Sequence, residues 1–172
     1  MGPFIRQPES VATDTNVVLA QEVQTQLSAS LPTEVLRWKE LIVGAAREYG
    51  LDPNLFAALI QKESWFPIGT WPQGFDRCPN GPVTPSCTST SGALGMAQVM
   101  PFHFAYNEDG RDPQTNLFRG AEILARYIEV KGGDLRLGLA AYNCGPNREP
   151  TSGCLAYADQ ILEWYAQALA TP

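Results

Sequence analysis

The sequence predicts a single, mostly α-helical domain with long loops stapled by disulfides. Apolar residues recur at near-helical spacing over most of the chain, which is the pattern of helices that bury one face. Two Asp-Pro pairs, at 52–53 and 112–113, are typical helix starts, because Asp caps the first amides and Pro suits the first turn. No segment has the alternating pattern of a strand. The chain has 172 residues, 44% of them hydrophobic, which suits one domain with a core of its own.

The N-terminal part of the sequence differs from the rest. It has a Pro-bearing start and one candidate helix, from Asn16 to Leu27. We interpret residues 1–32 as a tail or linker and residues 33–172 as the domain. From Thr33 to Gly50 the apolar residues follow helical spacing, which predicts the first helix of the domain.

The remaining elements follow from helix-start, helix-stop and loop signals. A helix is expected from Asp52-Pro53 to about Ser64, and a long loop over the Pro-, Gly-, Ser- and Thr-rich stretch Trp65–Gly92. A short helix is expected over Gly95–Met100, before Pro101. The last helices are expected from Asp112-Pro113 to Gly132-Gly133, over Asp134–Tyr142 and over Leu155–Ala170.

Four cysteines flank two loop-like stretches, one between Cys78 and Cys87 and one between Cys144 and Cys154. Three pairings are possible, and the local pairing is favoured because it staples loops that have little packing of their own. Four unrelated buried thiols or a four-thiolate zinc site are the alternatives, although zinc sites usually carry close C-x2-C pairs. Disulfides would imply export to the periplasm or the cell exterior.

Charge and hydropathy exclude some classes of partner. The chain has 12 basic and 18 acidic residues, whereas a nucleic-acid binder needs a basic face for phosphates. No apolar run approaches the ~20 residues that span a bilayer, and the N-terminus shows no basic-then-apolar signal peptide. We therefore expect no nucleic-acid partner and no transmembrane segment.

Glu63 occupies a notable place on the helix that begins at Asp52. Leu55, Leu59 and Glu63 are four residues apart and share one face of the helix, so a carboxylate continues an apolar stripe. Loss of hydration there would raise its pKa towards the range of a general acid. A helix-end Glu that reaches past the stripe to water is the more common outcome, so periodicity alone does not make Glu63 catalytic.

Three segments, in order, resemble the hallmarks of the soluble lytic transglycosylase family. They are Glu63-Ser64 at a helix end, the Gly- and Met-containing stretch from Gly92 to Pro101, and Ala141-Tyr142-Asn143-Cys144-Gly145. The resemblance covers about Thr33 to Ala170. It implies a lysozyme-like fold, as in goose-type lysozyme, that binds peptidoglycan glycan strands and needs neither a metal nor a cofactor.

The resemblance also implies roles for individual residues. Glu63 matches the sole catalytic carboxylate, and Tyr142 matches the tyrosine that orients it. The residues that match substrate-binding positions, or stand beside catalytic ones, are Ser64, Ser89, Gln98, Met100, Asn143 and Tyr157.

Two departures from the family pattern bear on function. The gap from Glu63 to Ser89 is much longer than the family norm, so the Cys78–Cys87 loop could remodel the groove or cover one end of it. The acidic residue that precedes the last tyrosine in the family is missing, since Gly153-Cys154-Leu155-Ala156 stands before Tyr157.

The chemistry implied by the resemblance needs one carboxylate. Glu63 would protonate the glycosidic oxygen between N-acetylmuramic acid and N-acetylglucosamine. It would then take the proton of the muramic acid 6-hydroxyl as that hydroxyl attacks, which leaves a 1,6-anhydro end. Domains of this kind act in wall turnover, phage lysis and secretion or conjugation machines, so a larger cell-envelope or secretion assembly is a candidate partner.

Three alternatives stay open at this point. A hydrolytic muramidase would need a second carboxylate to position water, and Asp76, Asp109 and Asp112 are available. A catalytically weak glycan-binding domain is the second alternative. A Cys–His peptidase would need a free thiol beside His103, the single histidine of the chain.

Overall fold

The computed structural model describes residues 26–65 and 78–171. Most of the candidate helix Asn16–Leu27, and Asp76, lie outside the described residues. Within them no strand is present beyond two isolated bridges, Thr88–Leu94 and Leu94–Val99, and the mostly α prediction is confirmed. The elements in order are α2 (Thr33–Leu36), α3 (Lys39–Glu48), α4 (Pro53–Ser64), the 3-10 turn η1 (Pro101–His103), α5 (Pro113–Val130), α6 (Leu135–Cys144) and α7 (Ser152–Ala170).

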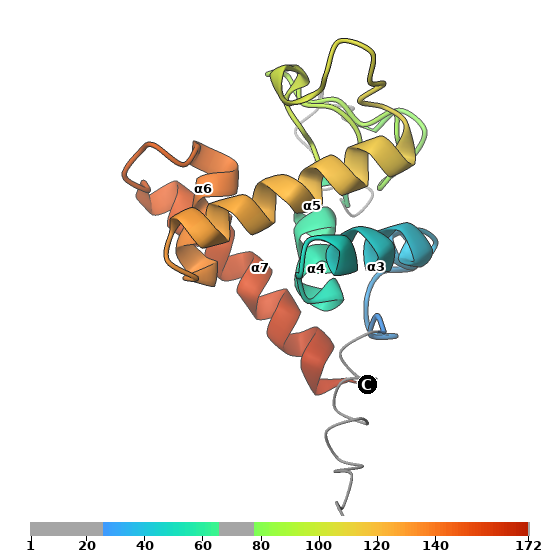
Figure 1. The fold of residues 1–172 in the computed structure, drawn as a ribbon. Coiled ribbons are helices and arrows are strands. Elements are labelled where there is room, and N and C mark those ends of the chain that lie inside the picture. The colour runs from blue at the N-terminus through green and yellow to red at the C-terminus, as the bar shows by residue number, and fades with distance from the viewer. Residues whose placement is uncertain (1–25, 66–77, 172) are drawn as a thin grey trace, which may run out of the picture.

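Helix α4 is the centre of the domain. It contacts α2, α3 and α7, and Figure 1 shows it in green between α3 and α7. Its start is the predicted one: Asp52 accepts a hydrogen bond from the Asn54 amide and Pro53 is the first helical residue. Every residue of α4 is buried except Lys62 and Glu63, near its C-terminal end. Because core packing fixes the helix on all sides, these two side chains project from a rigid support.

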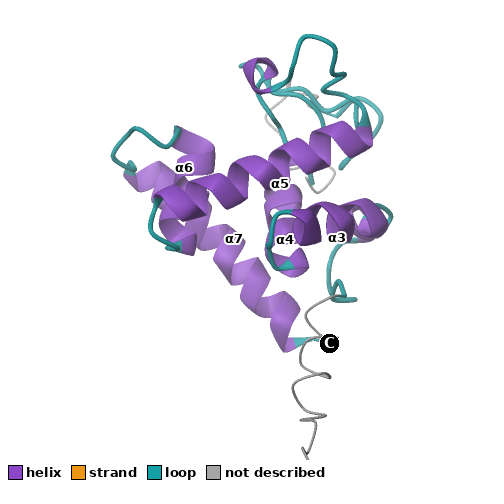
Figure 2. Ribbon diagram, in the orientation of Figure 1, coloured by secondary structure: helices purple, strands orange, loops and turns teal. Residues whose placement is uncertain are grey.

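The other long helices form a ring of packed pairs that includes α4. Helix α5 packs on α3 and α6, α6 packs on α7, and α7 returns to α4. Figure 2 shows the described loops between α4 and α5 gathered above the N-terminal half of α5. This loop region shares the core, since Val83, Met96 and Val99 are buried with the helical residues. The largest fully buried helical side chains include Ile42, Phe56, Leu59, Ile60, Leu117, Leu124, Leu139 and Ile161.

Both predicted disulfides are present. One joins Cys78 to Cys87 within the loop region. The other joins Cys144, the last residue of α6, to Cys154 in the first turn of α7. The second disulfide therefore ties together the two helices that carry Tyr142 and Tyr157.

The predicted single helix from Thr33 to Gly50 is wrong, because the structure breaks it between α2 and α3. At the break, the Trp38 indole donates to the carbonyl of Val83 at 2.8 Å, and Arg37 Nη2 donates to the same carbonyl at 2.7 Å. The side chains at the break thus hold the loop region against the helices. Residues 26–32 also contact the domain: the Ser28 amide donates to Asn54 Oδ1 at 2.8 Å, and Leu31 is buried.

The predicted short helix over Gly95–Met100 is also wrong. Leu94 and Val99 exchange two backbone hydrogen bonds, at 2.9 and 3.0 Å, around a tight turn. Gly95 and Gln98 have φ values of +71° and +49°, which a right-handed helix does not allow. In the described part of the chain, no helix combines the length and apolar content that crossing a bilayer requires.

Candidate active site

The carboxylate of Glu63 meets the phenol of Tyr157. The Tyr157 hydroxyl donates a hydrogen bond to Oε1 of Glu63, which joins the C-terminal end of α4 to the second turn of α7. Burial, followed by the charge of Glu63, raises the pKa of Tyr157 well above its ordinary value of 10.0. The phenol therefore keeps its proton at ordinary pH and acts as a donor to the carboxylate.

Tyr142 lies beside this pair but donates elsewhere. Its hydroxyl donates to the carbonyl of Ala97 at 2.8 Å, and a phenol has one proton to give. Burial, followed by the charge of Glu63, raises the pKa of Tyr142 well above 10.0, so Tyr142 lies within the electrostatic reach of Glu63. Tyr142 thus links α6 to the turn 94–99, while Tyr157 supplies the hydrogen bond to Glu63.

Asn116 organises the turn that faces Tyr142. It is fully buried on α5, and its Oδ1 accepts from the Ala97 amide at 2.8 Å. Its Nδ2 donates to the carbonyls of Leu94 and Gly110 at 2.8 and 2.9 Å. Sequence reasoning missed Asn116, although a polar residue directly before buried Leu117 was the available signal.

Gly120 allows α5 to approach this turn closely. A Cβ at this position would lie 2.6 Å from the Cβ of Ala97 and 3.2 Å from the hydroxyl of Tyr142. The distance to Ala97 is too short for a side chain and the distance to Tyr142 is tight, so a glycine fits best where α5, α6 and the turn 94–99 meet.

Gln98 has a buried side-chain oxygen that accepts no hydrogen bond from the described residues. Its Nε2 donates to the Gly95 carbonyl at 2.8 Å, and its Oε1 is buried with no hydrogen-bond partner among the described residues. Buried acceptors are normally paired, because desolvation without a hydrogen bond is unfavourable. Gln98 therefore offers an acceptor that an N–H or O–H group of a ligand could satisfy.

The other predicted substrate-binding residues differ in exposure. Ser64 is fully buried, and its hydroxyl donates to the carbonyl of Ile60 at 3.2 Å. Ser89 is half-buried, and its hydroxyl accepts from the Ala93 amide at 2.9 Å. Met100 is half-buried, and Asn143 is exposed. Asn143 and Tyr157 line one pocket of about 570 Å³, whereas Ser64 faces the interior.

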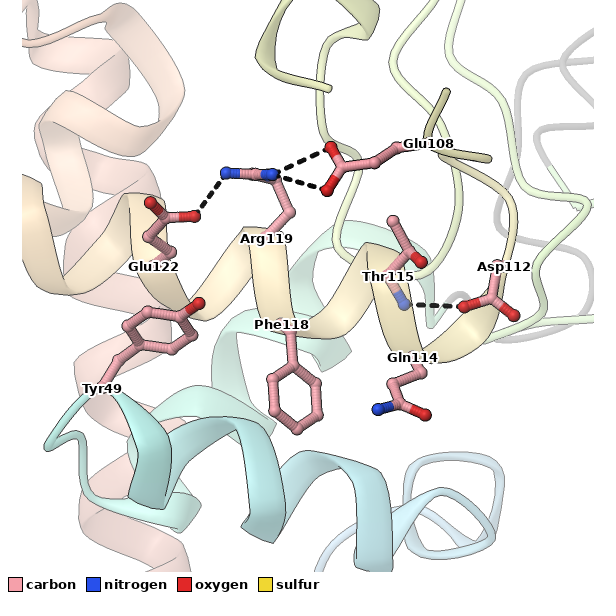
Figure 3. Close-up of a pocket in the computed structure, with 8 residues that line it drawn as sticks. All are labelled: Tyr49, Glu108, Asp112, Gln114, Thr115, Phe118, Arg119 and Glu122. Carbon is pink, nitrogen blue, oxygen red and sulfur yellow. Dashed lines mark hydrogen bonds and ion pairs between the residues drawn. The ribbon is translucent and has the colours of Figure 1, made fainter. Parts of the chain in front are cut away.

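A second pocket, of about 540 Å³, lies between α3, α5 and the loop after η1. Figure 3 shows Arg119 pointing from α5 towards Glu108 of that loop, with Glu122 on its other side. Arg119 pairs with Glu108 at 2.8 Å and with Glu122 at 2.6 Å. The pocket is lined by Asp112, one of the carboxylates available to a hydrolase, but by none of the residues predicted for a transglycosylase site. Its ion pairs anchor the loop that follows the turn 94–99.

Asp109 and Asp112, the two described carboxylates that were considered for a hydrolytic muramidase, each accept a hydrogen bond from a nearby backbone amide. Asp112 caps α5 by accepting from the Thr115 amide at 2.8 Å, and Asp109 accepts from the Arg111 amide at 2.9 Å. Among the described carboxylates, Glu63 alone contributes to the pKa shifts of Tyr142 and Tyr157.

The two disulfides exclude a Cys–His peptidase. All four cysteines are in disulfides, so a Cys–His peptidase has no thiol with which to attack a peptide bond. Within the ranges 26–65 and 78–171, no group of three or more His, Cys, Asp or Glu side chains could hold a metal ion.

Comparison with known proteins relates this geometry to a family. Residues 82–164 match the family model described as the transglycosylase SLT domain. A transglycosylase of Enterobacteria phage PRD1 is 32% identical over 115 residues, which cover 66% of this chain and 37% of the phage protein. An inactive mutant of the lytic transglycosylase Slt from Pseudomonas aeruginosa has a similar fold, with a TM-score of 0.55 at 20% identity over 77% of this chain and 24% of that one.

The matched range divides the candidate residues. Tyr142, Tyr157, Gln98 and Ser89 lie within residues 82–164, whereas Glu63 precedes them. The chain also spans little more than a third of the length of the phage transglycosylase.

Proposed function

We propose that this chain belongs to the SLT-type transglycosylase family, whose model it matches over residues 82–164, and that it cleaves peptidoglycan glycan strands as a lytic transglycosylase with Glu63 as its acid–base residue. The hydrogen bond between Tyr157 and Glu63 carries this proposal. It connects a carboxylate that precedes the family match to a tyrosine inside that match. The lysozyme-like fold shared with a lytic transglycosylase is consistent with it.

The first chemical step needs a positioned acid. Protonated Glu63 would give its proton to the glycosidic oxygen between N-acetylmuramic acid and N-acetylglucosamine as the C–O bond breaks. Tyr157 would hold the carboxyl group in a fixed orientation, because its own phenol does not ionise at working pH. The acetamido oxygen of the substrate can stabilise the developing positive charge at the anomeric carbon.

The second step returns the proton. The 6-hydroxyl of the same muramic acid attacks the anomeric carbon, and Glu63, now a carboxylate, takes the hydroxyl proton. The product is a 1,6-anhydromuramic acid end, and no water is consumed. Since the attacking hydroxyl belongs to the bound sugar, it has a high effective concentration, which suits a site where Asp109 and Asp112 are engaged in local structure.

Residues around the turn 94–99 would bind the glycan. The unpaired Oε1 of Gln98 would accept a hydrogen bond from an amide or hydroxyl group of a sugar. Tyr142 would support this wall of the site by holding the turn through Ala97. The two disulfides favour action outside the cytoplasm, where thiols stay oxidised.

Mass spectrometry of digested peptidoglycan tests the reaction. Wild-type protein should release fragments with anhydro ends. Reducing ends would instead identify a hydrolytic muramidase. Glu63→Gln should lower the release of fragments at least about a thousandfold, whereas Glu163→Gln, which changes an exposed carboxylate on α7, should not. Unchanged release by the Glu63→Gln variant would contradict both the transglycosylase and the muramidase mechanism.

A further inference from the structure

Lys62, directly before Glu63 on α4, lies over two aromatic rings of α7. Lys62 and Glu63 are the two residues of α4 that are not buried. The Lys62 ammonium lies 5.9 Å from the centre of the Tyr157 ring and 5.8 Å from that of the Trp164 ring. These cation–π contacts hold the charge over α7, and the same Tyr157 presents its hydroxyl to Glu63.

No carboxylate among the described residues forms an ion pair with Lys62. Arg119 and Arg136, by contrast, each pair with acidic side chains. Aromatic rings stabilise an ammonium without neutralising it. The positive charge beside the Tyr157–Glu63 pair is therefore available to an anionic group from outside the chain.

Lys62 lines a pocket whose composition matches such a group. The pocket has a volume of about 570 Å³, and its polar side chains include Asn143, Thr151 and Gln160. Among the described residues, Lys62 is its one charged lining residue and no acidic residue lines it, although the whole chain carries a net charge of −6. The stretch 153–156 carries no acidic residue and contributes Gly153, Cys154 and Ala156 to the wall.

We propose that Lys62 and this pocket bind a carboxylate of the peptidoglycan substrate and so select the strands that are presented to Glu63. This inference rests on the proposed function and deepens it. Peptidoglycan offers carboxylates from two sources: the peptide stem, and the lactyl group of muramic acid where the stem has been removed. A carboxylate held at Lys62 would fix the strand relative to Tyr157, whose hydroxyl positions the acid.

Initial cleavage rates on three substrates test the proposal: strands with intact stems, the same strands after conversion of their carboxylates to primary amides, and strands whose stems have been removed to leave lactyl carboxylates. Lys62→Met keeps an apolar chain over the rings and removes the charge. It should reduce the ratio of the rate on carboxylate-bearing strands to the rate on amidated strands about tenfold, as expected for loss of one charge-assisted hydrogen bond. Lys62→Arg should restore most of the ratio.

The substrates identify the source of the carboxylate. A loss confined to stem-bearing strands assigns the stem carboxylate, and a loss confined to denuded strands assigns the lactyl carboxylate. Lys39→Met is the matched control, because Lys39 is 63% exposed on α3, and its ratio should equal that of wild type. An unchanged ratio in the Lys62→Met variant, or an equal loss on amidated strands, overturns the proposal.

A binding measurement separates this proposal from the proposed function. Titration of the Glu63→Gln variant, with and without Lys62→Met, against a soluble disaccharide peptide should show about tenfold weaker binding without the lysine. If wild-type protein cuts no strand, the proposed reaction fails while the titration still decides the role of Lys62. If strands are cut but the two variants bind the disaccharide peptide equally tightly, the role of Lys62 fails while the proposed reaction stands.

Discussion

The hydroxyl of Tyr157 donates a hydrogen bond to the carboxylate of Glu63, although 94 residues separate them in the sequence. The pair joins the C-terminal end of α4 to α7, and both helices pack in the core. A second phenol on α7, Tyr165, lies within the electrostatic reach of Asp52 at the other end of α4, and burial followed by the charge of Asp52 raises the pKa of Tyr165 to about 12. A phenol of α7 thus stands near a carboxylate at each end of the central helix, and the one at the C-terminal end donates a hydrogen bond to the proposed acid.

Tyr157→Phe tests whether this contact matters for the reaction. The ring, and with it the packing and the platform for Lys62, would be kept, while the donor to Glu63 is lost. We expect kcat/KM on glycan strands to fall roughly 10-fold to 100-fold, as for loss of one hydrogen bond to a charged group. Tyr165→Phe is the control, because it removes the equivalent hydroxyl away from Glu63 and should affect stability alone. Equal activity in the two variants would contradict a role for Tyr157 in positioning the acid.

Asn116→Ala tests the organisation of the turn 94–99. The change leaves the Ala97 amide and the carbonyls of Leu94 and Gly110 without their partner. We expect the free energy of unfolding, measured by urea denaturation, to fall by about 3 kcal/mol, because buried polar groups would lose their hydrogen bonds. Asn107→Ala, on the exposed loop surface, should change it by less than about 0.5 kcal/mol. A similar small effect at Asn116 would mean that the turn holds without it.

The helices that the sequence predicted best are those whose signals are local. Helices α4 and α5 each begin with an Asp cap followed by Pro, and these residues act within their own first turn. The break between α2 and α3 depends instead on Trp38, which bonds Val83 45 residues away. The turn 94–99 depends on Asn116 in the same way. Spacing within one helix carries no information about such distant partners.

The same limit applies to the site. Helical spacing put Glu63 on an apolar stripe but could not indicate that a phenol from the last helix would meet it. The family motifs brought Tyr142 and Tyr157 to attention, and the structure distinguishes them by the partner of each hydroxyl, Ala97 for one and Glu63 for the other. Lys62 belongs to no motif, and the position of its ammonium over two rings of α7 depends on residues about 100 positions away in the sequence.

The Cys144–Cys154 disulfide should support activity as well as stability, because it fixes the end of α6 to the start of α7. Replacing both cysteines with serine should lower the free energy of unfolding by about 3 kcal/mol, as expected for a loop of this length. Loosening the two tyrosine-bearing helices should also reduce kcat/KM severalfold at a temperature where the variant is folded. The Cys78→Ser/Cys87→Ser pair is the comparison, since it unties a loop and leaves the α6–α7 link intact. If the two double variants lose activity equally, the Cys144–Cys154 disulfide does not set the relative position of Tyr142 and Tyr157.

Low pH should weaken the attachment of the Glu108 loop to α5 and so lower the stability of the domain. The backbone amide of Ala105, and then Arg119, lower the pKa of Glu108 below its ordinary value of 4.5. The folded state thus binds the Glu108 proton less readily than the unfolded state. Its contribution to stability is complete above about pH 4.5 and is lost as the pH falls through the lower, folded-state value. Asp112, whose pKa the Thr115 amide lowers below 3.8, adds to the same loss at still lower pH.

Glu108→Gln should therefore lower the free energy of unfolding at pH 7 and show a smaller further loss below about pH 4.5 than wild type does. Arg119→Gln should reduce the wild-type loss in the same window, because it removes the cation that favours the ionised carboxylate. Urea denaturation at a series of pH values measures both effects. If the stability curves of the three proteins run parallel through this window, Glu108 titrates alike in the folded and unfolded chains. The contact that Figure 3 shows between the loop and α5 would then contribute nothing to the acid sensitivity of the domain.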